Sequence, residues 1–295
     1  MQHSIDQLAQ ARGRQLVQDR GFTAPLLGAT DAVTGPTALG GFSSVGSLAI
    51  GIGGRLALGA SGVSLLGGVS YGQENYQDIR ASNVVSGALA IRYEFVGLGP
   101  SHPFVEAGGS LNSMGQLVIS RTYADGAGVA LGRGQTRGRA DGYYGRIGWV
   151  FAVGTADQLA LYGEYGHASQ SIRAYVEPLS MANPFEALVA GGTDSMDIAK
   201  LGVKFNHGLG GHLELGLNLG VAESLNVHEG VNANVDGIGA VTPTQAGDQT
   251  WAEYGAKLTY RLKSGAQVGV FIDGASGGAS IGTSIHGGIA LTARF

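Results

Sequence analysis

The sequence contains no cysteine, which excludes a disulfide-bonded scaffold and any metal site with thiolate ligands. Only 14% of its 295 residues are charged, and with a formal net charge of −4 we expect no binding to nucleic acid. The least charged stretch, residues 32–54, contains Pro36 and seven glycines, which excludes a transmembrane helix there. The first residues, MQHSID, lack the basic and apolar blocks of a signal peptide, so we expect a mature form or an excised part of a longer protein.

Glycine is abundant, with 53 residues, roughly 18% of the chain against an average near 7%. Each glycine inside a helix costs about 0.5–1 kcal/mol relative to alanine, which argues against a helical bundle. The glycines have no three-residue period, and Val, Ile, Leu, Phe and Tyr recur throughout, so the chain is neither collagen-like nor a disordered linker.

One helix is predicted, over residues 5–20. Ser4 and Gln7 have capping-box spacing, and Gly21 stands where a helix C-cap glycine is common. The segment is polar around most of its circumference, which suits a solvated surface or a polar, enclosed channel. Its length of about 24 Å is comparable to the thickness of a bilayer core.

The rest of the chain alternates between two kinds of residue. In residues 84–95, Val85, Leu89 and Ile91 share one face, while Ser86 and Arg92 share the other. The same pattern recurs at residues 143–153, 199–206, 212–221, 253–262 and 285–294. The second face is Gly, Ala and Ser with an occasional charge, which suits a crowded polar interior better than a water-exposed surface. The fold class indicated is all-β, a transmembrane antiparallel up-and-down barrel with an apolar exterior. The lumen of such a barrel is one of the two surroundings that suit the polar N-terminal helix.

Short connections alternate with long ones. Short turns are predicted near residues 60–62, 97–102, 154–158, 208–211 and 263–266, and longer loops near 77–82, 122–138, 178–194 and 227–247. Eleven strands are clear, and closure requires an even number, so a further strand is expected between residues 34 and 46. The alternative is that this span only tethers the helix. We therefore divide the chain into a helix and linker, residues 1–33, and a barrel of about 12 strands, residues 34–295.

A helix, a glycine-rich run of about twelve alternating strands and a terminal IALTARF together resemble the translocator domain of autotransporters, the type V secretion proteins of Gram-negative bacteria. The terminal strand, with Ile289, Leu291 and Phe295 on one face, resembles the signal read by the barrel assembly machinery. The resemblance implies a monomer in the bacterial outer membrane that exports its own upstream passenger, with the helix left in the pore. Lipid and lipopolysaccharide would surround it. The alternative is a porin-like passive channel with a plug helix.

Lumen-side glycines, such as Gly108, Gly148 and Gly202, would clear space for a helix or a passing chain. Two hypotheses describe the charges. In the first, Arg12, Arg14 and Arg20 of the helix pair with glutamates of the lumen wall, namely Glu94, Glu106, Glu164, Glu214 and Glu253. In the second, these glutamates pair across strands with wall cations, namely Arg92, Arg146, Lys200, Lys204, Lys257 and Arg261.

Catalytic signals are weak, and we expect no enzyme activity and no cofactor. The G-x-S-x-G pattern occurs at residues 68–72 and 274–278, but a chain this rich in glycine produces about one such match by chance. The seven histidines show no metal-ligand spacing, so no metal site is expected. Arg133, Arg137 and Arg139, with Arg121 nearby, are predicted to lie in an outer loop, either solvated or contacting lipopolysaccharide phosphates.

Overall fold

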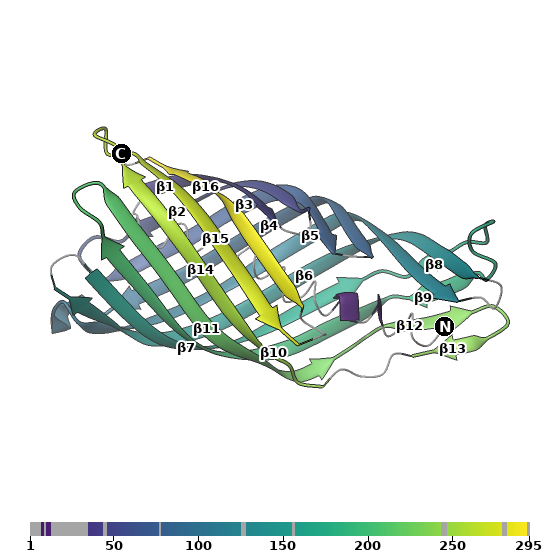
Figure 1. Ribbon diagram of the computed structural model, residues 1–295. Coiled ribbons are helices and arrows are strands. Elements are labelled where there is room, and N and C mark those ends of the chain that lie inside the picture. The colour runs from purple at the N-terminus through teal and green to yellow at the C-terminus, as the bar shows by residue number, and fades with distance from the viewer. Residues whose placement is uncertain are drawn as a thin grey trace.

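The computed structural model describes residues 7–8, 10–12, 35–43, 46–76, 78–124, 128–154, 157–242, 247–278 and 282–293. They form a closed antiparallel barrel in which each strand pairs with its neighbour in the chain and β1 pairs with β16 (Figure 1). The barrel strands are β1 (Gly35–Ser43), β2 (Leu48–Ala57), β3 (Val63–Tyr76), β4 (Ile79–Glu94), β5 (His102–Ala124), β6 (Val129–Val153), β7 (Asp157–Ile172), β10 (Gly192–Gly208), β11 (Leu213–His228), β14 (Thr250–Arg261), β15 (Gln267–Gly277) and β16 (Thr283–Thr292).

These twelve strands confirm the predicted fold class, and the strand expected between residues 34 and 46 is β1. Short connections gather at one end, called here the turn end, which also carries the short 3₁₀ helix η1 (Val96–Leu98). The other end, called the distal end, carries the long connections. No helix among the described residues is long and apolar enough to cross a membrane.

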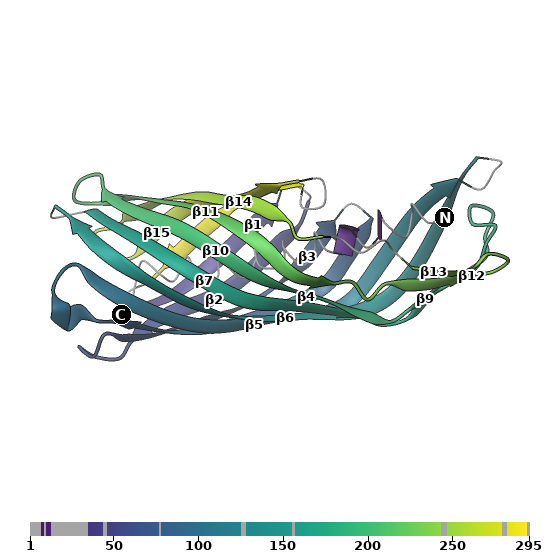
Figure 2. The same ribbon diagram turned by 90° about the horizontal axis from the view of Figure 1, so that it is seen from below.

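A second, four-stranded sheet extends the distal end, built from the two longest connections (Figure 2). It contains β8 (Tyr175–Glu177), β9 (Ala187–Ala190), β12 (Asn232–Val235) and β13 (Gly239–Val241). Its β8 lies beside β6, because the Arg173 N–H donates to the Arg137 carbonyl (3.0 Å) and the Leu131 N–H to the Ala182 carbonyl (2.7 Å). We call this sheet, together with the distal parts of β4, β5 and β6, the distal extension.

Residues 122–138, predicted as a loop, are mostly strand: β5 continues to Ala124 and β6 begins at Val129. The loop predicted at 77–82 is likewise shorter, because β4 begins at Ile79. In the glycine-rich stretch of β6, the missing side chains leave room for distal side chains that lie over the strand. A Cβ at Gly134 would overlap the Tyr175 ring, and one at Gly132 would overlap the Glu177 carboxylate.

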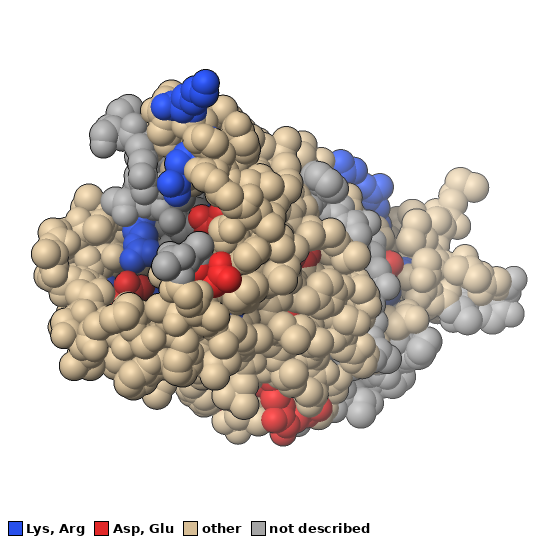
Figure 3. All heavy atoms as spheres, turned by 60° about the vertical axis from the view of Figure 1, so that its left-hand side comes forward, with Lys and Arg blue, Asp and Glu red and all other residues tan. Residues whose placement is uncertain are grey.

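The barrel wall is apolar on the outside, as the alternation predicted. On β4, Leu89 is 65% exposed and faces outward, whereas Arg92 is 7% exposed and faces the lumen. The exposed belt ends in aromatic side chains on both sides, Tyr93, Trp149 and Tyr260 toward the turn end and Tyr71, Tyr143, Tyr165 and Tyr254 toward the distal end. In Figure 3 most of the visible side wall carries no charge, and charged side chains gather around the hollow at the turn end.

The distal extension has the opposite polarity, because β4 and β5 change faces together. Asn83, with a left-handed φ of 56°, lies opposite Gly115 in the register of these strands, and both neighbouring ladders shift by one residue at this level. Such paired bulges invert the parity of the residues beyond them. Leu117 and Ile119 therefore point inward, where each is at most 1% exposed.

Candidate functional site in the barrel lumen

The lumen wall carries a row of alternating charges on neighbouring strands. Residues directly opposite one another in the register are Arg92 and Glu106, Glu106 and Arg146, Arg146 and Glu164, and Glu164 and Lys200, so the sign changes at every step from β4 to β10. Opposite charges at directly paired positions stabilise a sheet, whereas like charges there destabilise it. We call this row the charge ladder.

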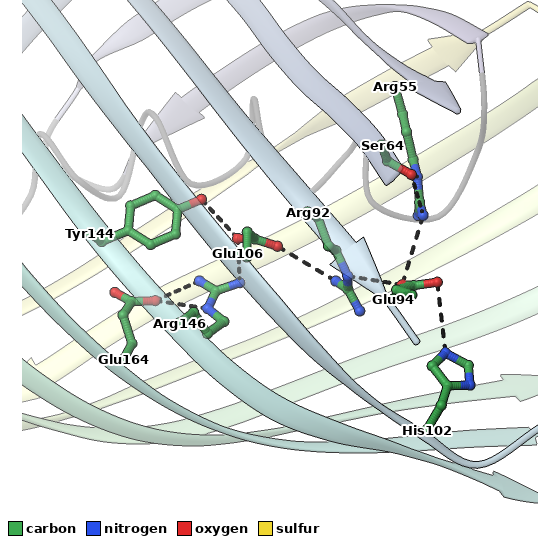
Figure 4. A network of polar contacts seen from close by, with 9 residues as sticks. All are labelled: Arg55, Ser64, Arg92, Glu94, His102, Glu106, Tyr144, Arg146 and Glu164. Atoms are coloured by element: carbon green, nitrogen blue, oxygen red, sulfur yellow. Dashed lines mark hydrogen bonds and ion pairs between the residues drawn. The ribbon is translucent and has the colours of Figure 1, made fainter. Parts of the chain in front are cut away.

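The contacts within the charge ladder are close (Figure 4). Arg146 bridges its two neighbours, with Nη1 at 3.1 Å from Glu106 and Nη2 at 2.6 Å from Glu164. The Tyr144 hydroxyl donates a further hydrogen bond to Glu106 at 2.8 Å. Arg92 lies 3.6 Å from Glu106 and places its guanidinium 4.1 Å from the centre of the Phe104 ring.

The ladder continues at both sides. Toward the turn end, Arg92 pairs with Glu94 at 2.9 Å, and Glu94 also lies 3.8 Å from both Arg55 and His102. On the other wall, Lys200 pairs with Glu253, which also accepts a hydrogen bond from the Trp251 indole at 3.0 Å. Charged side chains of β2, β4, β5, β6, β7, β10 and β14 thus line the lumen.

The remaining predicted wall residues lie on the same strands. Lys204 and Lys257 are partly buried on the lumen side, and the Lys204 ammonium lies 6.0 Å from the centre of the Tyr162 ring. Glu214 is partly buried near the turn end, whereas Arg261 is exposed at the last position of β14. Ile289 and Leu291 face outward on β16 at 56% and 54% exposure, and Phe295 lies outside the described residues.

Several lumen glycines make room for aromatic side chains of the wall itself. A Cβ at Gly108 would lie 2.7 Å from the Tyr144 ring, and a Cβ at Gly148 would lie 2.6 Å from the Phe104 ring. Gly202 is covered by Tyr162 in the same way. The hypothesis that these glycines clear space for a helix or a passing chain therefore needs correction: at these three positions the space is filled from neighbouring strands.

The N-terminal segment meets the wall at the distal end. Residues 7, 8 and 10–12 are helical, and the small purple helix lies beside the distal extension (Figure 1). Arg12 Nε lies 2.6 Å from Asp194 Oδ2, both side chains being at most 5% exposed, and Arg12 Nη2 donates to the Gly192 carbonyl at 3.3 Å. Leu8 and Ala11 pack in an apolar cluster with Ile79, Met114 and Leu117.

The partner of Arg12 thus differs from the five glutamates expected. Glu94, Glu106, Glu164 and Glu253 contact cations of the strands, which is the second hypothesis, and Arg12 contacts Asp194. Asp194 also accepts the Gly230 N–H at 2.8 Å; burial raises the pKa of its carboxyl, while Arg12 and this hydrogen bond act in the opposite direction. Arg14 and Arg20 lie outside the described residues. Asp194 could have been found by parity, because it shares the inward face with Met196 and Ile198.

A second buried ion pair holds the distal extension together. Arg121 Nη2 lies 2.5 Å from Glu177 Oε2 and Arg121 Nε 3.3 Å from Oε1, with the two side chains at most 2% exposed. Sequence reasoning missed Glu177, because a three-residue strand in a long connection has no readable period. Arg121 was grouped with Arg133, Arg137 and Arg139, but these three are exposed on the outward face of β6. Among the described residues no group of three or more His, Asp and Glu side chains could hold a metal ion.

An antiparallel barrel with an even number of strands, an apolar belt outside and a charged lining inside is an outer-membrane β-barrel. In such barrels the short turns are periplasmic and the longer loops lie outside the cell. No protein-family model matches the sequence, and no curated protein is significantly similar to it.

Solved structures do match. The translocator domain of the autotransporter NalP from Neisseria meningitidis is similar with a TM-score of 0.67 and 16% identity, over 97% of this chain and 99% of that one. The transport unit of the autotransporter AIDA-I from Escherichia coli is similar with a TM-score of 0.50 and 11% identity, over 97% and 98%. The outer membrane protease OmpT from Escherichia coli is more distant, with a TM-score of 0.43 and 14% identity over 89% and 97%. The chain therefore has the fold of an autotransporter translocator domain.

Proposed function

We propose that this barrel is the translocator domain of an autotransporter, that it mediates export of an upstream passenger, and that its N-terminal segment plugs the pore. The observation that carries the proposal is the position of Arg12. It is bound on the inward side of the distal end, whereas Gly35 starts β1 at the turn end, opposite Arg55. The chain therefore changes ends between these two residues, and a route through the lumen leaves the upstream sequence at the cell surface.

The lining suits the passage of a polypeptide. In the charge ladder each carboxylate has a cation beside it, so the wall is polar without a large excess of one sign. A wall of paired charges offers hydrogen-bonding groups to any passing backbone while holding no particular sequence strongly. In this proposal the ion pairs of the wall keep the lumen polar, and Arg12 holds the N-terminal segment in place once export has ended.

Export is tested with a reporter domain joined before residue 1 and a signal peptide before the reporter. On intact cells that produce this fusion, added protease should cleave the reporter. A heat-dependent shift of the barrel in electrophoresis then shows that the barrel itself is folded. A folded barrel with the reporter protected in the periplasm contradicts the export role and favours the passive channel.

Plugging is tested separately, by conductance in planar bilayers. Deleting residues 1–21 should raise the conductance, and Arg12→Ala should produce frequent openings because the buried Asp194 loses its cation. Arg139→Ala, which removes an exposed arginine paired with Asp141 on the outer face, is the matched control and should leave conductance unchanged. Equal conductance with and without residues 1–21 would mean that this segment does not block the pore.

A further inference from the structure

Five arginines lie together on the outward face of the distal extension, and we call them the arginine strip: Arg80, Arg133, Arg137, Arg139 and Arg173, all exposed. Arg133, Arg137 and Arg139 share the outward parity of β6. Arg173 follows β7 and is hydrogen-bonded through its backbone to Arg137. Arg80 lies two strands away, because it pairs with Val118, which pairs with Gln135 of β6.

The strip begins just beyond the membrane belt. Tyr143 is 64% exposed on the outward face of β6 and belongs to the distal aromatic girdle. Arg139 is four residues further along the same strand, about 13 Å at the rise of an extended chain. Because barrel strands tilt by about 35–45°, Arg139 lies about 10 Å beyond Tyr143 along the membrane normal, where a barrel side chain meets lipid headgroups of the outer leaflet. Arg137 and Arg133 continue the strip outward from there.

The charge of this face contrasts with the rest of the molecule. The whole chain has a net charge of −4, yet the strip has five cations, of which Arg139 pairs with the nearby Asp141 at 3.2 Å. The outward face of β10 and β11 instead carries the acids Asp197 and Glu223. Every cation of the strip is arginine, whose planar fork binds phosphate oxygens in pairs, and Ser113 and Ser171 flank Arg139 in the register.

We propose that the arginine strip binds the phosphate groups of a phosphorylated glycolipid of the outer leaflet. The arginines pair with the phosphates, and the flanking serines can bond sugar hydroxyls. The proposal rests on the location of the barrel in the outer membrane and is independent of the export role. The phosphate belongs to a membrane lipid, because the strip adjoins the belt that lipid tails cover.

The test measures binding of bisphosphorylated lipid A to the full chain, refolded in a neutral detergent, by native mass spectrometry. The double variant R137Q/R173Q should bind about tenfold more weakly than the wild type, and Arg137→Lys should bind with an intermediate affinity because it keeps the charge without the fork. Lys263→Gln removes one cation at the turn end and is compared with Arg137→Gln, which removes one in the strip. Only Arg137→Gln should weaken binding.

Three further results decide the outcome. Dephosphorylated lipid A should bind the wild type and R137Q/R173Q equally weakly. Equal affinity of the double variant and the wild type for the bisphosphorylated lipid overturns the proposal. So does displacement of the lipid by millimolar inorganic phosphate, which would mean that the strip takes free anions rather than a lipid headgroup. Circular dichroism and heat-shifted electrophoresis check that each variant is folded.

Discussion

The same strands follow opposite rules in two regions of the molecule. In the membrane belt β4 and β5 turn large apolar residues such as Leu89 and Leu111 outward and keep Arg92 and Glu106 inside. Beyond Asn83 and Gly115 these strands bury Ile79, Leu117 and Ile119 instead. The difference follows from the surroundings, because lipid stabilises a barrel with an apolar exterior, whereas water stabilises a fold with an apolar interior. One pair of bulges suffices to change from one rule to the other.

The largest effect is expected from a charge placed on the buried face beyond the bulges. Leu117→Asp loses the burial of a large apolar side chain and leaves an unpaired carboxylate at a position where Leu117 is 0% exposed. The lost burial costs about 1.5–3 kcal/mol and the buried charge several more, so the total is about 5 kcal/mol or more, enough to unfold the distal extension while the belt remains folded. Limited proteolysis of the barrel in vesicles should then release distal fragments.

The matched control for this variant is Val118→Asp, which changes the next residue of β5, on the partly exposed outward face. If the parity of the belt continued past Gly115, Val118 would be the inward residue and Leu117 the outward one. The carboxylate of Val118→Asp keeps its contact with water and should leave the distal extension resistant to protease. If the two variants gave the same protease pattern, the bulge would not be what separates the two regions.

The next effect concerns the buried ion pair of the distal extension. Arg121→Ala leaves Glu177 unpaired at 0% side-chain exposure, which costs about 3–5 kcal/mol. Arg139→Ala removes an exposed partner of Asp141 and should cost no more than about 0.5 kcal/mol. Urea unfolding followed by a fluorescent probe on the distal sheet measures both. Equal midpoints for the two variants would contradict a dry distal core.

A charge placed on the outward face distinguishes lipid from water. Leu89→Arg puts a cation near the middle of the belt and should destabilise the barrel by about 2–4 kcal/mol. Leu131→Arg changes a residue that is 41% exposed on the outward face of the distal extension, and should have almost no effect. Unfolding in lipid vesicles measures both changes. A large loss of stability in Leu131→Arg would mean that lipid covers the outward face beyond the level of Tyr143.

Sequence alone was sufficient for the belt and insufficient for the distal extension. Strand alternation depends only on local residues, so the outward positions of Val85, Leu89 and Ile91 could be read directly. The distal part of β6 could not, because Gly132 and Gly134 weaken the strand pattern, and the Tyr175 and Glu177 side chains that lie over them come from a distant segment. The missing information was long-range packing.

The candidate site was predicted in the same uneven way. Parity placed Arg92, Glu106, Arg146, Glu164 and Lys200 on the lumen face. It could not show that they stand directly opposite one another, because register depends on the lengths and bulges of the connections between strands. Parity places Asp194 on the inward face of β10, but its contact with Arg12 joins residues far apart in the sequence, and neither segment shows which residue is the partner.

The smallest effect is expected from a comparison of packing on the lumen side and on the lipid side of the belt. Two glycines of β6, three residues apart, allow it. Gly148→Val adds a side chain whose Cβ would lie 2.4 Å from the Leu161 carbonyl oxygen and 2.6 Å from the Phe104 ring, and overpacking that forces backbone shifts costs about 1–3 kcal/mol. Gly145→Val adds the same side chain on the outward face, where nothing lies within 4 Å, and should be neutral or slightly stabilising because lipid covers it. Unfolding in vesicles compares the two. Since Phe104 also stacks against Arg92, Gly148→Val should in addition disturb the charge ladder and alter single-channel conductance. Equal stability and equal conductance for both variants would mean that the lumen side is no more tightly packed than the lipid side.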